Sequence, residues 1–402
     1  MEKTKIINIC DRIVLFSIYA TVFFLPISNA LIETFSIMAI VFYAIKKILQ
    51  YRDVQISPVG FAVLVYFIIC GFSIFISSNP EISLNAFIGK VAQNILFFFV
   101  VAETLNTERR VKNLLYILFF SASVVGVDGI YQHFTHKDFI RHRPYYDIPR
   151  IHASFANSNG LACYLQIVSF FVLVSLFIKL RFKLFKILFA ALFVLLVICL
   201  VLTSSRGGLY AFISGILFMG IWIRTIMISF LALGIIIVSL SYFSWFKQRP
   251  DGFFAFLGGG DTDRRQMWYA ARMMFKSSPW VGVGLGTFMF NFRKFTDGVY
   301  PQGVPYAHNC YLQIADETGI IGLAVFLSIL VLFFWSGIKR INSGQKTFFW
   351  YILLASLAAV FGYCVQMAVD VIFYSLDLGI LFWLLLGLGV AAMERVKLEG
   401  VK

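Results

Sequence analysis

Charged residues are scarce in this sequence. They make up 13% of its 402 residues, while hydrophobic residues make up 60%; a soluble domain carries about 25% charged and about 45–50% apolar residues. Acidic residues are the rarer kind, with 20 Asp and Glu against 34 Lys and Arg. This composition excludes a soluble globular protein and predicts an integral membrane protein.

Clustered cysteines and a cleavable leader are also lacking. The six cysteines are scattered, mostly within apolar runs, and no CxxC or Cys/His spacing occurs, so neither a zinc site nor a disulfide framework is expected. The N-terminal segment "MEKTKIINICDRIVLFSIYATVFFLPIS" has basic residues and an apolar run but no small-x-small cleavage site. We therefore expect a retained first span rather than a removed signal peptide.

Long apolar runs recur along the chain and predict about twelve membrane-spanning helices, because a span needs roughly 20 apolar residues. They lie near residues 12–28, 30–46, 59–78, 86–104, 111–131, 159–178, 183–203, 207–223, 225–245, 317–338, 347–369 and 376–394. The expected fold is an all-α membrane protein with helical regions 1–131, 159–245 and 317–402. Two long loops, 132–158 and 246–316, separate these regions, and we expect short amphipathic helices in them.

The short loops predict the orientation. Every second one is basic: Lys46 and Lys47 follow the second run, and Arg109 and Arg110 follow the fourth. Because cytoplasmic loops collect Lys and Arg, both termini are expected in the cytoplasm and both long loops outside. The same rule gives the net charge of +14 an explanation that needs no nucleic acid.

The two long outer loops are unexpectedly rich in positive charge. Their basic residues are Lys137, Arg141, Arg143, Arg150, Lys247, Arg249, Arg264, Arg265, Arg272, Lys276, Arg293 and Lys294. Such a concentration favours an anionic ligand on the outer face. The alternative is a merely solvated surface, since long loops can cross a membrane whatever their charge.

Three arginines are the strongest candidates for binding an anion. Arg206 lies in "VLTSSRGGLYAF" between two spans, where an arginine normally has a partner or a function and where its planar fork suits phosphate oxygens. Arg264 and Arg265 begin an amphipathic helix, whose first turn offers free N–H groups to an anion. The alternatives are an arginine that reaches the lipid headgroups and a helix that lies on the outer leaflet.

Two glycine-rich patterns carry weaker signals. Asp261 and Asp263 in "DTD" could hold a divalent cation, but the arginines that follow would compete for that role. We prefer capping of the next helix by Asp263. The stretch "VGVGLGTF" has no preceding strand and no GxGxxG spacing, so it is interpreted as a flexible connection rather than a nucleotide loop. No metal or cofactor is predicted.

Polar residues also stand next to or within the apolar runs. The segment "YYDIPRIHASFANSNGLACYL" places Arg150, His152, Asn157 and Asn159 just before the sixth run. These residue types suit recognition of sugar and phosphate, and they also suit a polar loop that ends in a helix cap. Within the predicted spans, Lys90 of the fourth run and Asp128 of the fifth could form an ion pair or join a structural polar network.

His308 precedes one of the most hydrophobic runs, in "PYAHNCYLQIADETGIIGLAVF". An imidazole can accept a proton near neutral pH, and a general base typically contributes about 10²–10⁴-fold to a rate. Metal ligation would need partner ligands, and none stands three or four residues later. The remaining interpretations are a catalytic base and an interfacial histidine with a structural hydrogen bond.

Four motifs in order resemble the O-antigen ligase/polymerase superfamily, multi-pass glycosyltransferases of the GT-C class. His308-Asn309, nine residues and then "GIIG" look like the family's H-[N/S/Q]-x9-G-x-x-G pattern, with Glu317 where members often carry an acid. "SSRGG" matches the family's arginine at an outer helix end. "DRRQMWYAARMMFKSSPWVGVGLGTF" is similar to its R-x3-W segment, which places the motif arginine at Arg264. "RIHASFANSNGLACYL" resembles its R-x-x-[G/S]-x-F-x-N-x-N-x-x-A stretch.

This resemblance implies transfer of a glycan from undecaprenyl diphosphate at the periplasmic face of the bacterial inner membrane. His308 would be the base, and Arg206 with Arg264 or Arg265 would bind the diphosphate, without a metal and with inversion at the anomeric carbon. Possible substrate contacts are Arg150, His152, Asn157, Asn159, Asn309 and Glu317.

The resemblance leaves the acceptor open. It would be a lipid A-core sugar for an O-antigen ligase, or the next repeat unit for an O-antigen or exopolysaccharide polymerase. A third hypothesis, a flippase or transporter of lipid-linked glycans, predicts inverted repeats or charges along the spans. No convincing repeat is visible, and the charge gathers in the outer loops.

Overall fold

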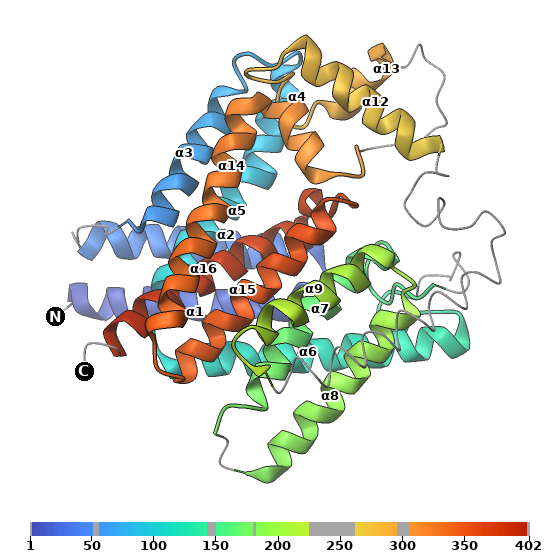
Figure 1. Cartoon of the computed structure of the whole chain (residues 1–402). Helices are drawn as coiled ribbons and strands as arrows, with labels where there is room; N and C mark the ends of the chain where they lie inside the picture. Colours follow the sequence, from blue (N-terminus) through green and yellow to red (C-terminus); the bar gives the residue numbers. More distant parts are fainter. Residues whose placement is uncertain are drawn as a thin grey trace.

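The computed structural model describes residues 2–50, 56–142, 150–179, 182–224, 262–295 and 306–399, of which residues 2 and 262–265 without their side chains. Over these residues the protein is helical and contains no strand (Figure 1). The predicted all-α fold class is therefore confirmed for the described part of the chain. Helices are the expected solution in lipid, because they satisfy their backbone hydrogen bonds internally.

The helices follow the apolar runs of the sequence. They are α1 (Glu2–Phe24), α2 (Asn29–Gln50), α3 (Pro58–Phe72), α4 (Pro80–Ala86), the π-helix η1 (Phe87–Ala92), α5 (Gln93–Thr104), α6 (Glu108–Thr135), α7 (Ser158–Ser175), α8 (Lys183–Leu202), α9 (Arg206–Gly220), α12 (Thr262–Ser277), α13 (Phe288–Phe295), α14 (Cys310–Ser343), α15 (Phe348–Met367), the 3-10 helix η2 (Ile372–Tyr374) and α16 (Leu376–Glu399). The predicted run 225–245 lies outside the described residues.

Among the described residues, 8 helices are long and apolar enough to cross a membrane: α1, α4 to α5 taken together, α6, α7, α8, α14, α15 and α16. This supports a multi-pass membrane protein. It does not confirm the predicted count of twelve: α2 is not among the eight, and α3 and α9, at 15 residues each, are short for a span. The start of α14 at Cys310 also extends its predicted run into the second long loop.

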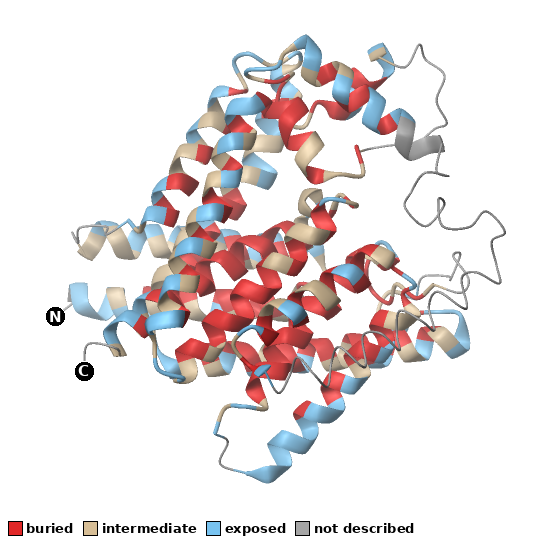
Figure 2. Ribbon diagram, viewed as in Figure 1, coloured by how far each residue is buried: buried red, intermediate tan, exposed pale blue. Residues whose placement is uncertain are grey.

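The helices form a buried centre and an outer layer (Figure 2). In α7, 94% of the span is buried, whereas the corresponding share is 33% for α1 and 39% for α8. Small residues allow the close approach at the centre: a β-carbon on Gly208 of α9 would lie 2.5 Å from Ala162 Cβ of α7. Such close contacts are typical of helix packing in membranes, where no hydrophobic force drives helices together.

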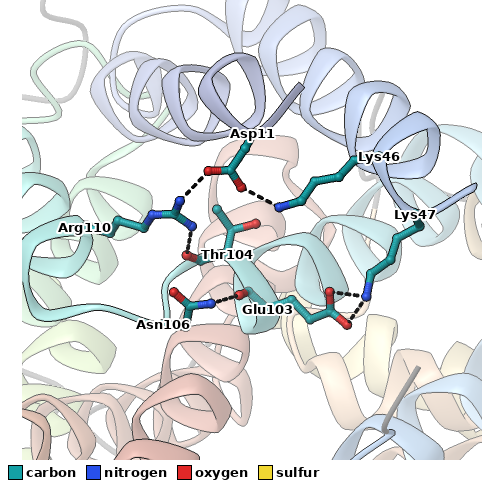
Figure 3. A network of polar contacts seen from close by, with 7 residues as sticks. All are labelled: Asp11, Lys46, Lys47, Glu103, Thr104, Asn106 and Arg110. Carbon is teal, nitrogen blue, oxygen red and sulfur yellow. Dashed lines mark hydrogen bonds and ion pairs between the residues drawn. The ribbon is translucent and has the colours of Figure 1, made fainter. Parts of the chain in front are cut away.

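Charged side chains join four helices at one end of the bundle (Figure 3). Asp11 of α1 pairs with both Lys46 of α2 and Arg110 of α6. Beside them, Lys47 Nζ lies 2.6 Å from Glu103 Oε1 of α5. These basic residues follow the second and fourth predicted runs, so the structure brings together side chains that the orientation rule assigns to one membrane side.

The chain termini lie on the same side of the bundle, and α12 and α13 lie at the opposite end (Figure 1). The helices α7 and α9 both begin at the end of the bundle away from the termini, and both pack against α15. The first long loop is shorter than predicted on its N-terminal side, because α6 continues to Thr135.

The helix α14 is broken at Gly319, which has φ 68° and ψ −173°. The break frees backbone groups of the helix, and Ile320 N donates to Pro279 O at 2.8 Å. A β-carbon on Gly319 would lie 2.2 Å from Trp280 O. Only glycine fits this position without strain, since its φ is positive and a neighbouring backbone fills the space.

The stretch 281–288 packs into this break, which corrects its interpretation as a flexible connection. Three of its glycines have positive φ. Gly284 N donates to Glu317 O at 3.0 Å on α14, and Ser78 N donates to Val283 O at 2.9 Å. The glycines therefore let a tight backbone turn hydrogen-bond to two separate segments, and the turn is an ordered structural element.

Candidate functional site

His308 lies on a short segment that is hydrogen-bonded to the residues directly after α15. Asn309 caps α14 by accepting from Leu312 N at 3.1 Å, and its Nδ2 donates to Ala368 O at 2.9 Å. Cys310 Sγ donates to Asp370 O at 3.0 Å. His308 itself has φ 51°, a left-handed conformation that is uncommon outside glycine and that often marks functional sites.

A carboxylate faces His308. The distance from His308 Nδ1 to Asp370 Oδ1 is 3.8 Å, with side-chain exposures of 33% and 8%. Within the described part of the chain, His308 Nδ1 is buried and makes no hydrogen bond. The approach is too long for a hydrogen bond, but catalytic hydrogen bonds are often long before substrate binds. The histidine therefore has Asp370 on its Nδ1 side, and Nε2 is the ring nitrogen that does not face this carboxylate.

Arg206 begins α9 on the other side of Asp370. Ser205 caps the helix by accepting from Gly208 N at 3.2 Å. A β-carbon on Gly207 would lie 4.0 Å from Asp370 Oδ2 and 2.9 Å from Val369 Cγ2, so glycine lets the first turn of α9 approach the end of α15. A helix N-terminus and an arginine together favour an anion.

Arg150 and Asn159 join the same region. Arg150 Nη2 donates to Asn159 Oδ1 at 2.9 Å, and Arg150 Nε donates to Thr203 O at 3.1 Å just before α9. Gln366 Nε2 of α15 donates to Asn159 O at 2.9 Å. The N-termini of α7 and α9 are thus linked to α15 by polar contacts, a few residues before Asp370.

Several predicted site residues have structural partners instead. Asn157 caps α7 by accepting from Gly160 N at 2.8 Å, and Asn309 caps α14 as described above. The ring of His152 lies next to its neighbour's backbone, with Nδ1 2.9 Å from Ala153 O and Nε2 3.3 Å from Gln132 Nε2. Asn157 and Asn309 thus act as helix caps, and His152 belongs to a polar loop. For the segment before α7, this is the structural alternative that the sequence left open.

Glu317 lies at a cavity of about 220 Å³, which is lined by residues of α3, α4, η1, α5, α13, α14, η2 and α16 and of the 281–288 stretch. Lys90 of η1 also lines it and approaches Tyr306 Oη at 3.3 Å. Of the two alternatives that the sequence left open, an ion pair between Lys90 and Asp128 is not formed: Asp128 Oδ1 accepts from Phe139 N at 2.7 Å. Burial, together with the Glu317 carboxyl, raises the pKa of Tyr374 well above its ordinary value, so this phenol on the cavity wall stays protonated.

Arg264 and Arg265 begin α12, but their side chains lie outside the described residues, as does Asp261. Asp263 is the second residue of α12, which begins at Thr262, and its side chain lies outside the described residues, so the predicted cap stays a prediction. Across the described residues, no group of three or more His, Cys, Asp or Glu could hold a metal ion.

The fold and these residues define a multi-pass membrane protein in which His308, Asp370 and the first turn of α9 lie close together where helices end. Residues 191–327 match the family model described as O-antigen ligase. The match covers Arg206 and His308 and confirms the resemblance to the O-antigen ligase superfamily seen in the motifs. A comparison with curated proteins gave no match.

Asp370 is the residue that the sequence motifs missed. It stands alone between two apolar runs, in "QMAVDVIFYSLD", and no spacing connects it with His308. The available signal was its place: an acidic residue in the short loop between the last two predicted spans, on the side where His308 was also expected. Tyr306 was missed for a similar reason, since aromatics are abundant in this chain.

Proposed function

We propose that this protein is an O-antigen ligase-like glycosyltransferase. It transfers a glycan from undecaprenyl diphosphate to a sugar of the lipid A-core at the periplasmic face of the bacterial inner membrane, with both termini in the cytoplasm. The family match supports an O-antigen ligase or polymerase type of function. The single observation that carries the chemistry is the juxtaposition of His308, Asp370 and the first turn of α9.

His308 acts as the general base in this proposal. Its Nε2 takes the proton of the acceptor hydroxyl while that oxygen forms a bond to the anomeric carbon. Asp370, on the Nδ1 side, holds the ring and stabilises the imidazolium that forms. The bond from the anomeric carbon to the diphosphate oxygen breaks, and its electron pair leaves with the diphosphate. Attack opposite to the leaving group inverts the anomeric carbon.

The leaving diphosphate needs positive charge, because its negative charge increases as the bond breaks. Arg206 and the N–H groups at the start of α9 supply it, and Arg264 or Arg265 of α12 adds to it. The arginines take the role that a divalent cation has in other transferases, so the reaction is proposed to be metal-independent. A transporter would need no base, and the pairing of His308 with a carboxylate therefore favours the transferase.

The test uses the full-length protein in lipid nanodiscs with an undecaprenyl-diphosphate-linked glycan and either lipid A-core or a second lipid-linked glycan. We expect product on lipid A-core; product only with the second glycan would make the protein a polymerase. His308→Ala should abolish transfer and retain donor binding, whereas His133→Ala, a histidine on α6, should be active. Near-normal transfer by His308→Ala would remove this residue from the mechanism.

A further inference from the structure

The cavity of about 220 Å³ beside Glu317 has a composition that suits a sugar. Tyr306, two residues before His308, lines it, while His308 faces Asp370, which lies next to the first turn of α9. We propose that this cavity binds the acceptor sugar, so that His308 stands between an acceptor subsite and the donor diphosphate. This inference rests on the proposed function and adds to it the place where the acceptor is held.

Two buried polar atoms of the cavity wall need a partner. Glu317 is fully buried, and its Oε1 accepts from Gln313 Nε2 at 3.0 Å. In the described part of the chain, Glu317 Oε2 and Asn94 Oδ1 make no hydrogen bond, although the backbone N–H groups of Gly286 and Phe288 face the Glu317 carboxyl. Buried acceptors without a donor are costly and rare in native proteins. The hydroxyl groups of a sugar are donors of the right kind for both.

The remaining wall offers flat apolar surfaces and one cation. Tyr66, Trp383 and Phe288 line the cavity, and the apolar face of a sugar ring packs well against aromatic rings. Lys90 reaches over Tyr306, with Nζ 5.5 Å from the ring centroid. Its helix η1 is a π-helix, a distortion frequently found at functional sites.

Residues next to His308 in the sequence line the cavity. Tyr306 and Gln313, on either side of His308, both line the cavity, while Asp370 contacts His308 from the α9 side. Tyr374 follows Asp370 and also lines the cavity, with its ring centroid 5.6 Å from that of Tyr306. One short segment thus carries the base and part of the cavity wall.

Other occupants fit less well. A lipid chain would leave Glu317 Oε2 and Asn94 Oδ1 without partners in a dry site. The donor diphosphate would meet the carboxylate of Glu317, a like charge, whereas Arg206 offers it a positive site. A neutral polyhydroxyl ring satisfies the acceptors and is not repelled.

The first experiment measures steady-state transfer with the full chain in nanodiscs. Glu317→Gln and Lys90→Met should raise the acceptor KM about tenfold or more, the usual effect of losing a hydrogen bond to a charged group, and leave the donor KM within about twofold. Glu81→Gln and Lys137→Met change exposed residues of the same types and should match the unchanged protein. An unaltered acceptor KM, or a raised donor KM, would overturn the assignment.

The second experiment does not depend on transfer, so it separates failure of this inference from failure of the proposed function. Saturation-transfer NMR would probe the methyl glycosides of glucose, galactose and N-acetylglucosamine with the same nanodiscs. We expect a signal from at least one glycoside that persists in His308→Ala and disappears in Val91→Phe, which fills the cavity from η1. Absence of any signal with the unchanged protein, or a signal that persists in Val91→Phe, would refute an acceptor site here.

Discussion

Replacing Asp370 by asparagine tests the link between the carboxylate and His308. The substitution keeps the shape of the side chain and the backbone carbonyl that accepts from Cys310. It removes one negative charge at 3.8 Å from His308 Nδ1. If His308 becomes an imidazolium during transfer, that charge stabilises the transition state more than the ground state and therefore contributes to kcat.

The size of the effect follows from the distance. Two unit charges at this separation interact by about 4 kcal/mol at an effective dielectric constant of about 20. The His308 side chain is 33% exposed, so solvent screening reduces this to about 2 kcal/mol. Since about 1.4 kcal/mol corresponds to a factor of ten in rate, we expect Asp370→Asn to lower kcat by about 30-fold with little change in either KM.

The assay compares transfer rates of the unchanged protein, Asp370→Asn, His308→Ala and the double variant. If Asp370 acts through His308, adding Asp370→Asn to His308→Ala costs little more, because interacting residues are non-additive. Glu81→Gln, an exposed carboxylate on α4, is the matched control. A kcat close to normal in Asp370→Asn, or losses that simply multiply in the double variant, would refute the reasoning.

Three further outcomes are expected. Arg206→Ala should weaken binding of undecaprenyl diphosphate about tenfold or more in a titration, while Arg272→Ala, an exposed arginine of α12, should not; equal affinities would defeat the anion site. Gly319→Ala should lower the unfolding temperature by the equivalent of about 2 kcal/mol or more, because its φ is 68° and Trp280 O would lie 2.2 Å from the new β-carbon. Gly89→Ala is the control and should leave the stability unchanged, because a β-carbon there has no atom within 4 Å. A Gly319→Ala variant as stable as the unchanged protein would contradict the strain argument. Transfer should continue in EDTA at an unchanged rate, and loss that added Mg²⁺ restores would establish a metal requirement.

Much of the fold could be predicted from hydrophobicity, because a membrane requires long apolar helices whatever their partners. Each predicted run except 225–245, which lies outside the described residues, overlaps a helix. The number of spans was harder, because α3 and α9 are short and because helix length alone does not fix which helices cross.

The candidate site was predictable only in part. Arg206 and His308 stood out because polar residues at the ends of apolar runs are unusual. Asn157 and Asn309 looked equally suitable for a ligand, but they cap α7 and α14. A sequence pattern cannot separate these roles, since an amide serves a helix end and a sugar equally well.

The sequence by itself determined that this is a helical membrane protein with basic outer loops, because those properties depend on composition and on local order. It also determined the spacing between His308 and Gly319, which places the base and the helix break on one segment. Only the tertiary structure decided which side chains and which cavity lie near His308. Asp370 comes from a loop 60 residues beyond Cys310, and the cavity at Glu317 is assembled from helices that are far apart in the sequence, from α3 to α16. Such contacts depend on how helices pack, and packing follows from the fit of all side chains together rather than from any local pattern.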